Sequence, residues 1–244
     1  MNYSEIEKYN NNGEIKIPKF INKKEIFHIL QEYKKFIFKK HGKFGKDYNH
    51  LNFSDKLTSL HRLEKYRNTY FFKIASKKKI LSTAEKLLGY KCKLHTIQFF
   101  FKNSKQNLAT PPHQDNAFWC FKNGRGLSFW IALNKTSKLN GALYYYRKTH
   151  HRDIRHIPSL GTPGSSQKIK IKKKMNKTYY KLNAGDSVAH DSRIIHGSFN
   201  NQQLKDRKAF ILSYVTNDSK KDFKKTIKYK KRLSKIILKN KIFN

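Results

Sequence analysis

The stretch Thr110-Pro111-Pro112-His113-Gln114-Asp115-Asn116-Ala117-Phe118-Trp119 places a histidine and an aspartate two residues apart beside an aromatic segment. Side chains alternate between the two faces of a β-strand, so His113 and Asp115 are expected to point the same way. One further imidazole would complete the two-histidine, one-carboxylate ligand set of non-heme Fe(II) sites. The pattern recurs at His151-Arg152-Asp153, which lies in a loop rich in Pro and Gly and is expected to be a decoy.

Around this stretch the chain has the pattern of a β protein. Aromatic and branched residues predict strands over residues 95–102, 127–133, 142–146, 168–172, 187–190 and 209–215. Asn140-Gly141 predicts a hairpin turn, and Asn200-Asn201 predicts another turn. About seven short strands separated by turns are typical of a jelly roll or barrel.

The first third of the chain favours helices instead. A short edge strand over 14–19 precedes an N-cap pattern at Asn22 and Glu25 and an apolar helical stripe up to residue 40. Residues 41–54 are expected to be a loop and 57–63 a short helix, and a further helix runs from Ser76 to Gly89. We therefore predict a single domain over 1–244, with a helical N-terminal layer (1–90), a β core (91–218) and a basic C-terminal tail (219–244).

The net charge of +38, from 54 basic and 16 acidic residues, suggests binding to nucleic acid or to an anionic membrane. The lysines are spread along the chain, however, and Asn, Ile, Phe and Tyr are also frequent. An AT-rich genome would produce the same bias, and we favour this explanation. The tail predicts a basic amphipathic helix, which we expect to pack one face on the barrel.

Other features of the sequence bear on location and assembly. No apolar run is long enough to span a membrane, and the N-terminus has no apolar secretory segment. Cys92 and Cys120 are too few for a disulfide framework, which favours the reducing cytosol. Cys120 is expected in the core or a pocket wall, and the chain is taken as a monomer by default.

The second imidazole is expected from His196, with His190 as its nearest rival. If residues 194–199 and 206–212 form a hairpin, Arg207 lies beside His196 across the ladder. A guanidinium suits the far carboxylate of a 2-oxo acid that chelates iron, because it binds carboxylates through two parallel hydrogen bonds. Ser198 shares the face of His196 and would donate a third.

These residues resemble the phytanoyl-CoA dioxygenase family of Fe(II)/2-oxoglutarate oxygenases over about residues 15–215. His113-Gln114-Asp115 is similar to the HQD motif of that family, and residues 127–133, with Trp130, resemble the strand that follows it. Asn140-Gly141-Ala142-Leu143 resembles the NGxL turn, and Gly185-Asp186, His196-Gly197-Ser198 and Arg207 resemble its GD…HGS…R segment.

The resemblance implies a double-stranded β-helix (jelly roll, cupin-like) with N-terminal helices packed on the barrel. It implies that His113, Asp115 and His196 bind Fe(II), that Arg207, Ser198 and Trp130 contact 2-oxoglutarate, and that Ile97 lines its pocket. With O2 as the other co-substrate, the expected reaction is hydroxylation of a C–H bond in a small metabolite or an acyl or lipid-type substrate.

Departures from the family pattern limit what the resemblance implies. Arg147-Lys148-Thr149-His150 stands where the family has a PGSH-like turn, so a family substrate does not carry over. The lysine that helps to bind co-substrate in some members has no secure match, and residues 61–65 are its expected vicinity. The presence of Asp115 argues against halogenation. The alternative function is a basic nucleic-acid- or polyanion-binding protein on a degenerate oxygenase scaffold.

Overall fold

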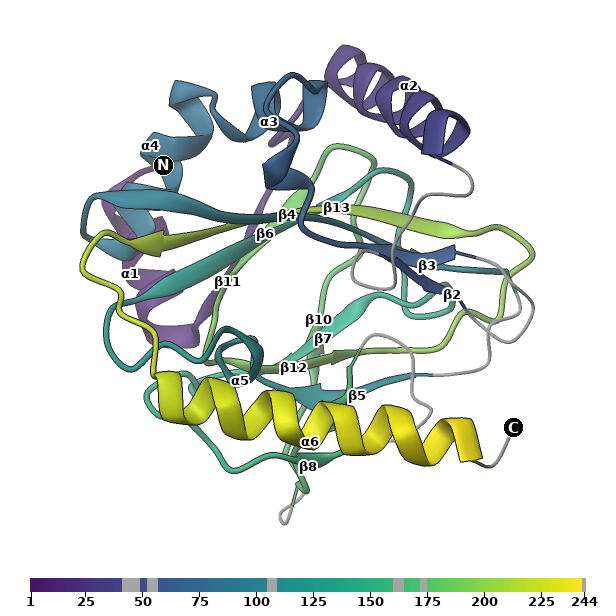
Figure 1. Ribbon diagram of the computed structural model, residues 1–244. Coiled ribbons are helices and arrows are strands. Elements are labelled where there is room, and N and C mark those ends of the chain that lie inside the picture. Colours follow the sequence, from purple (N-terminus) through teal and green to yellow (C-terminus); the bar gives the residue numbers. More distant parts are fainter. Residues whose placement is uncertain (41–48, 52–56, 105–108, 160–164, 172–174, 243–244) are drawn as a thin grey trace.

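The computed structural model describes residues 1–40, 49–51, 57–104, 109–159, 165–171 and 175–242. Two antiparallel sheets face each other (Figure 1). The large sheet has the order β1 (Glu14–Ile17), β11 (Ser187–Asp191), β6 (Gly126–Ala132), β13 (Arg207–Thr216), β4 (Cys92–Lys102), β3 (Leu57–Leu60) and β2 (Asn49–Leu51). The small sheet has the order β10 (Thr178–Tyr179), β7 (Leu143–Tyr146), β12 (Ile195–Ser198) and β5 (Thr110–His113). β8 (Ile157–Pro158) pairs with β9 (Gln167–Lys168). The predicted jelly-roll fold class is confirmed.

Side chains of the large sheet alternate between two separate apolar clusters. Phe129 and Leu212 belong to the core between this sheet and the helices, together with Phe99 and Phe210. Their strand neighbours Trp130 and Ile211 belong to the interior between the two sheets. This is the two-residue period of a β-strand, and it decides which side chains can reach a site inside the barrel.

Helices cover the outer face of the large sheet. They are α1 (Tyr3–Asn12), α2 (Lys23–Lys40), η1 (Leu63–Lys65), α3 (Tyr70–Ala75) and α4 (Lys78–Leu88); α2, α3 and α4 lie over the sheet and α1 beside its β1 edge (Figure 1). The predicted cap of α2 is confirmed, because the side chains of Asn22 and Glu25 each accept a hydrogen bond from the other's backbone N–H. Gly89 ends α4 in the left-handed conformation, as the sequence pattern indicated.

Two predictions for the first third are wrong. Leu57 and Leu60 lie in strand β3 and Leu63 in a single 3-10 turn, so 57–63 is not a helix. Residues 49–51 of the expected loop form β2, while 41–48 and 52–54 lie outside the described residues. β1, β2 and β3 all join the large sheet, so the N-terminal segment is not purely helical. β2 pairs with its sequence neighbour β3, but β1 pairs with β11 and β3 with β4, which are distant in sequence, and local periodicity carries no information about those partners.

The two predicted hairpins are crossovers between the sheets. β12 pairs with β5 and β7, whereas β13 pairs with β4 and β6, so Arg207 is not across a ladder from His196. The side-chain amide of Asn201 holds the intervening segment by donating to the carbonyls of Lys102, Asn103 and Lys205. Likewise the Asn140-Gly141 turn leads from β6 in the large sheet to β7 in the small one.

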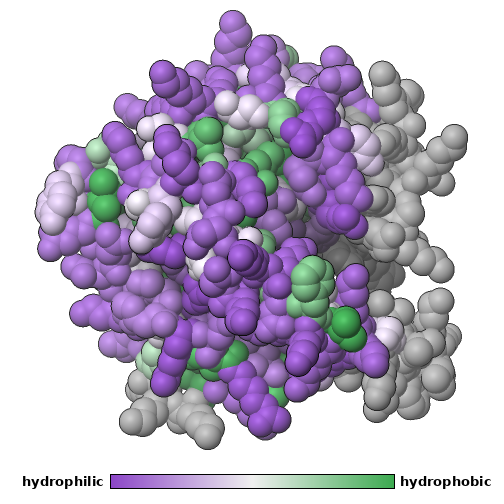
Figure 2. Space-filling model, turned by 60° about the vertical axis from the view of Figure 1, so that its left-hand side comes forward, coloured by the Kyte–Doolittle hydropathy of each residue, from purple (hydrophilic) through white to green (hydrophobic). Residues whose placement is uncertain are grey.

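The basic tail forms α6 (Phe223–Ile242), which lies beside the short helix α5 (Asn116–Trp119) (Figure 1). The ring of Tyr229 in α6 packs against Phe118 in α5, with centroids 5.8 Å apart. Among the described residues, no helix has the length and apolar character needed to cross a membrane. The face shown in Figure 2 is mostly hydrophilic, with hydrophobic residues in small separate patches. Cys92 and Cys120 are both buried and free.

Candidate metal centre

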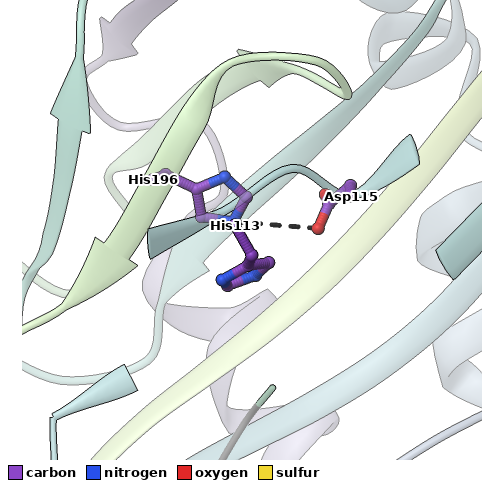
Figure 3. A group of neighbouring side chains, drawn as sticks. All are labelled: His113, Asp115 and His196. Carbon is purple, nitrogen blue, oxygen red and sulfur yellow. Dashed lines mark ion pairs between the residues drawn. The ribbon is translucent and has the colours of Figure 1, made fainter. Parts of the chain in front are cut away.

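The structure brings the three predicted metal ligands together inside the barrel. β5 and β12 pair so that His113 lies opposite His196, and their ring centroids are 4.4 Å apart. One ligand atom from each of His113, Asp115 and His196 lies within 4.8 Å of the others (Figure 3). β5 ends at His113, however, and Asp115 has helical backbone angles at the start of α5. The carboxylate therefore reaches the centre through a turn, and not through strand alternation as expected.

Backbone carbonyls fix the protonation of both histidines. Nδ1 of His113 lies 2.8 Å from the carbonyl oxygen of Pro111, and Nδ1 of His196 lies 3.1 Å from that of Ile194. A carbonyl only accepts, so Nδ1 carries the hydrogen and Nε2 keeps its lone pair. Burial lowers the pKa of both rings, which keeps them neutral. Neutral rings with a free Nε2 are the form that binds a metal ion.

Asp115 is held in position by its second oxygen. Oδ2 accepts a hydrogen bond of 3.0 Å from Ser128 and lies 3.4 Å from Nε2 of His190, whereas Oδ1 lies 3.7 Å from Nε2 of His196. Burial alone would raise the pKa of this carboxyl group, but its hydrogen bond with His190 and the neighbouring imidazoles hold the pKa well below its usual range. The group is thus an ionised carboxylate with Oδ1 directed at the histidine pair.

His190, the rival candidate, lies behind the carboxylate and not in the ligand group. Its Nδ1 is 3.3 Å from the hydroxyl oxygen of Tyr145, and its Nε2 faces Asp115. Tyr145 on β7 of the small sheet and Asp115 at the start of α5 therefore occupy both ring nitrogens. This is the position of a residue that orients a metal ligand from behind.

The second His-x-Asp pair, predicted to be a decoy, joins no group of three metal-ligating residues among the described residues. His151 is exposed, and Asp153 forms ion pairs with Lys225 and Arg193. Within the described part of the chain, only His113, Asp115 and His196 gather three such ligand atoms. Cys120 is buried, with Sγ 3.6 Å from the carbonyl oxygen of Ala117, so it is a core residue as expected.

The interior also contains a buried arginine without a counter-charge. Arg207 is 3% exposed, and its Nη1 donates a long hydrogen bond of 3.4 Å to the carbonyl of Phe100. Its Nε has no hydrogen-bond partner, and no carboxylate among the described residues pairs with it. The guanidinium lies over the ring of Trp130, 5.1 Å from the centroid. Burial lowers its pKa to about 9, so the group is still charged at neutral pH.

Lys102 is a second buried basic side chain at the same place, and it was not predicted from the sequence. It is the register partner of Arg207 on β4 and is 3% exposed. Its Nζ donates to Ser198 Oγ at 2.8 Å and to the carbonyl of Phe199 at 2.7 Å. Burial and the neighbouring Arg207 lower the pKa of Lys102 to about 6. The sequence feature that could have identified Lys102 is its position in a phenylalanine-rich strand, where it falls among the residues whose side chains face the barrel interior.

The NG turn makes room for this lysine. Gly141 has a φ of +91°, and a Cβ atom there would collide with the side chain of Lys102 and lie 3.1 Å from the carbonyl oxygen of Phe199. Gly197, between His196 and Ser198, is similarly confined, because a Cβ would lie 2.6 Å from the carbonyl oxygen of Thr110. The two glycines of the NGxL and HGS motifs thus permit close packing around the site.

The remaining predicted contacts fall into two groups. Trp130 and Ser198 lie with Arg207 and Lys102, and Ser198 also donates to Thr110 Oγ1 at 2.9 Å. Ile97 does not join them, because it belongs to the core on the helix side of the large sheet. Its strand neighbour Gln98 lies 2.6 Å from Nδ1 of His61, the first residue of the 61–65 segment. Ile97 occupies a position of β4 whose side chain faces the helices, so it does not reach the interior between the two sheets.

The segment that replaces the PGSH-like turn is tied to the N-terminal residues. Arg147 forms an ion pair of 2.7 Å with the buried Glu14, and the backbone N–H of Lys148 donates to the carbonyl of Asn12. Nε2 of His150 lies 3.0 Å from the carbonyl oxygen of Asn10. This segment therefore holds the first helix and strand to the end of β7.

The candidate metal ligands and the Arg207–Lys102 pair lie about two strand residues apart in the barrel interior. His196 and Ser198 are separated by two residues on β12, and Ser128 and Trp130 by two residues on β6. Two residues of an extended strand span about 7 Å. The three ligand atoms fit a metal ion with open positions, and Arg207 with its neighbour Lys102 fits the far carboxylate of an anion that reaches that ion.

Comparisons with known proteins agree with this geometry. The model of the phytanoyl-CoA dioxygenase (PhyH) family matches residues 9–209. The epimerase SnoN of nogalamycin biosynthesis, crystallised with Fe3+, alpha ketoglutarate and nogalamycin RO, superposes with a TM-score of 0.71 at 18% identity, covering 88% of this chain and 84% of SnoN. EctD from S. alaskensis with bound Fe gives 0.74 at 16% identity, covering 91% and 80%. EvdO2 from Micromonospora carbonacea var. aurantiaca, complexed with 2-oxoglutarate, gives 0.71 at 16% identity, covering 91% and 94%.

At these identities the likeness to solved structures shows the fold. A search of curated proteins gave no match.

Proposed function

The chain belongs to the phytanoyl-CoA dioxygenase family, and we propose that it is an Fe(II)- and 2-oxoglutarate-dependent hydroxylase of a small molecule. The family match covers most of the chain, and the neutral-histidine and carboxylate cluster fits an iron ion. His113, Asp115 and His196 would hold the iron. With 2-oxoglutarate and O2, such a centre supplies the oxidising power to attack an unactivated C–H bond.

The observation that carries the co-substrate assignment is the buried, charged Arg207 with the buried basic side chain of Lys102 beside it. A buried charge without a partner is costly, and the described residues supply no carboxylate to neutralise Arg207. A dicarboxylate whose near end lies at the metal would bring its far carboxylate to this pair. The arginine fork would then make the two-pronged contact, while Lys102 and Ser198 would contribute single hydrogen bonds.

The surrounding side chains would orient the co-substrate and exclude water. Trp130 packs against the guanidinium with its ring face, and Ile211 and Ala209 complete the apolar wall. A dry wall strengthens the charge-assisted contacts of Arg207 and confines the oxidising chemistry to the bound substrate. Ser128 and His190 hold the Asp115 carboxylate in place throughout.

The residues of this chain do not distinguish between a small metabolite and an acyl or lipid-type molecule as the substrate. We propose a small molecule, because the related folds include EctD, which was crystallised with 2-oxoglutarate and 5-hydroxyectoine, and the nogalamycin enzymes. The intact ligand set argues against the degenerate, polyanion-binding scaffold, since a degenerate site has no need of a tautomer-fixed histidine pair.

The test is a titration of 2-oxoglutarate into anaerobic Fe(II)-loaded protein, following the metal-to-ligand charge-transfer band. Formation of the band, and release of succinate when O2 is admitted, would support the proposal. A chain that binds no iron, and is retained on nucleic acid in a salt-sensitive manner, would support the alternative.

A further inference from the structure

The outward face of α6 combines exposed apolar side chains with uncompensated positive charge. Phe223 is 76% exposed and Ile227 is 54% exposed, four residues apart on one face of the helix. Lys224, Lys228 and Lys231 flank them and are exposed as well. Ile227 and these lysines line one shallow groove together with Arg232. Residues 223–242 include nine basic residues and no acidic one.

The opposite face of the helix is already used for packing on the protein. Tyr229 packs against Phe118, Lys225 pairs with Asp153 at 2.7 Å, and Arg232 donates to the carbonyl of His156 and to Gln167. These contacts fix which way the helix faces. The stripe of Phe223, Ile227 and the three lysines is therefore the face that remains for a partner, and we call it the α6 stripe.

Simple exposure to water does not explain why apolar side chains and like charges are gathered on the α6 stripe. Lys224 and Lys228 are four residues apart, and like charges at that spacing destabilise a helix. An anionic surface would relieve this repulsion. Nucleic acid would satisfy the lysines but would leave the aliphatic side chain of Ile227 in water, whereas the boundary of a lipid bilayer accepts both apolar residues.

We propose that the α6 stripe docks the protein on an anionic lipid surface. Phe223 and Ile227 would insert at the boundary between head groups and acyl chains, and the lysines would pair with anionic head groups. The helix would lie in the plane of the interface without crossing it. The docking does not depend on iron or 2-oxoglutarate, so it goes beyond the proposed enzymatic function.

The experiment is co-sedimentation of the full chain with vesicles of phosphatidylcholine alone or mixed with phosphatidylglycerol. Binding is expected only with the mixed vesicles and should weaken as salt is added, because salt screens exposed charges. Lys224→Glu, Lys228→Glu and Lys231→Glu together should abolish it. Each lysine contributes about five-fold to partitioning near an anionic surface. Phe223→Ser with Ile227→Ser should also weaken binding.

The chain offers a matched control patch with the same chemistry. Leu139 and Leu204 are 56% and 77% exposed, and Lys135, Lys138 and Lys205 are exposed near them in the loops at the ends of β6, β7 and β13. Variants with Leu139→Ser and Leu204→Ser, or with Lys135→Glu, Lys138→Glu and Lys205→Glu, should retain binding to the mixed vesicles. Equal losses in both patches, or equal binding to neutral vesicles, would overturn the proposal. Retention on duplex DNA that needs the lysines but not Phe223 and Ile227, without vesicle binding, would assign the stripe to nucleic acid instead. Circular dichroism and 2-oxoglutarate binding check the fold of each variant.

Discussion

The metal-binding end and the cationic end of the barrel interior differ in how their charges are satisfied. At the metal end, each histidine donates to a backbone carbonyl, and Asp115 accepts from Ser128 and faces His190. At the cationic end, Arg207 has an unpaired Nε, and Lys102 has two neutral oxygen partners beside a second cation. The first arrangement is preorganised by the protein itself, whereas the second leaves Arg207 without a carboxylate partner among the described residues, as the proposed binding of an anion requires.

This difference has a thermodynamic consequence. Residues at the metal end already have their supporting contacts, so substituting a ligand should remove metal affinity. At the cationic end, Arg207 carries a desolvation cost that no described carboxylate offsets in the free protein. Substituting Arg207 should therefore weaken anion binding without a matching loss of stability.

The largest expected effect is loss of iron on His113→Ala or His196→Ala. Changes in residues that merely support a metal ligand typically cost 10- to 100-fold in affinity, so removing a ligand should cost more than about 100-fold. Metal content by mass spectrometry after anaerobic loading measures this. His151→Ala is the matched control and should load fully. Iron retained in both ligand variants but lost from the control would reverse the assignment.

Arg207→Met tests the cationic end. Truncating one partner of a buried charge-assisted pair costs about 2–5 kcal/mol, or roughly 30- to several-thousand-fold in 2-oxoglutarate affinity. Iron content should be unchanged. Thermal unfolding of the metal-free variant should occur at or above the parent temperature, because a buried charge is replaced by an apolar side chain. Unchanged co-substrate affinity would place the anchor elsewhere, with Arg193 as the next residue to test.

Ser128→Ala tests whether support behind Asp115 matters at the metal end. The variant removes the hydroxyl group that donates to Oδ2, and iron affinity should fall by about 10- to 100-fold. Competition with a chelator of known affinity measures the change. Ser165→Ala, a buried serine outside the site, is the control. An effect no larger than that of the control would mean that His190 alone positions the carboxylate.

The smallest effect is a pH dependence from Lys102. Its pKa of about 6 in the free protein should rise when a dianion binds beside it. The anion thus binds the protonated form better: affinity is full below pH 6 and falls as the pH rises through 6, by at most about ten-fold per unit. Calorimetry in buffers of different ionisation enthalpy should detect uptake of a proton on binding. Lys102→Met should abolish that uptake, and uptake that persists in the variant would assign it to another group.

Sequence reasoning identified side chains better than it identified their geometry. His113, Asp115, His196, Trp130, Ser198 and Arg207 all lie in the barrel interior. The expected hairpin that led to Arg207 is wrong, because β12 and β13 belong to different sheets. Ile97 and Lys102 lie on one strand, and the odd position faces the helices while the even one faces the site. From residue 96 to 102 the even positions are mostly polar and the odd positions are apolar, so the alternation was present in the sequence, but the polar set was not recognised as facing the interior.

The sequence by itself predicted the fold class, the candidate metal ligands, the capping box of α2 and the glycine that ends α4, although the N-cap residue of α4 is Lys77 and not Ser76. These depend on residue types at fixed spacing, such as a His-x-Asp pair, an Asn-to-Glu cap or a glycine after a helix. Only the tertiary structure decided that β1, β2 and β3 complete the large sheet and that His190 supports Asp115. It alone placed Lys102 beside Arg207, since the β3–β4, β4–β13 and β1–β11 pairings join residues about 40 to 175 positions apart and depend on which strands pair. Strand pairing is set by burial over the whole chain, and no local pattern records it.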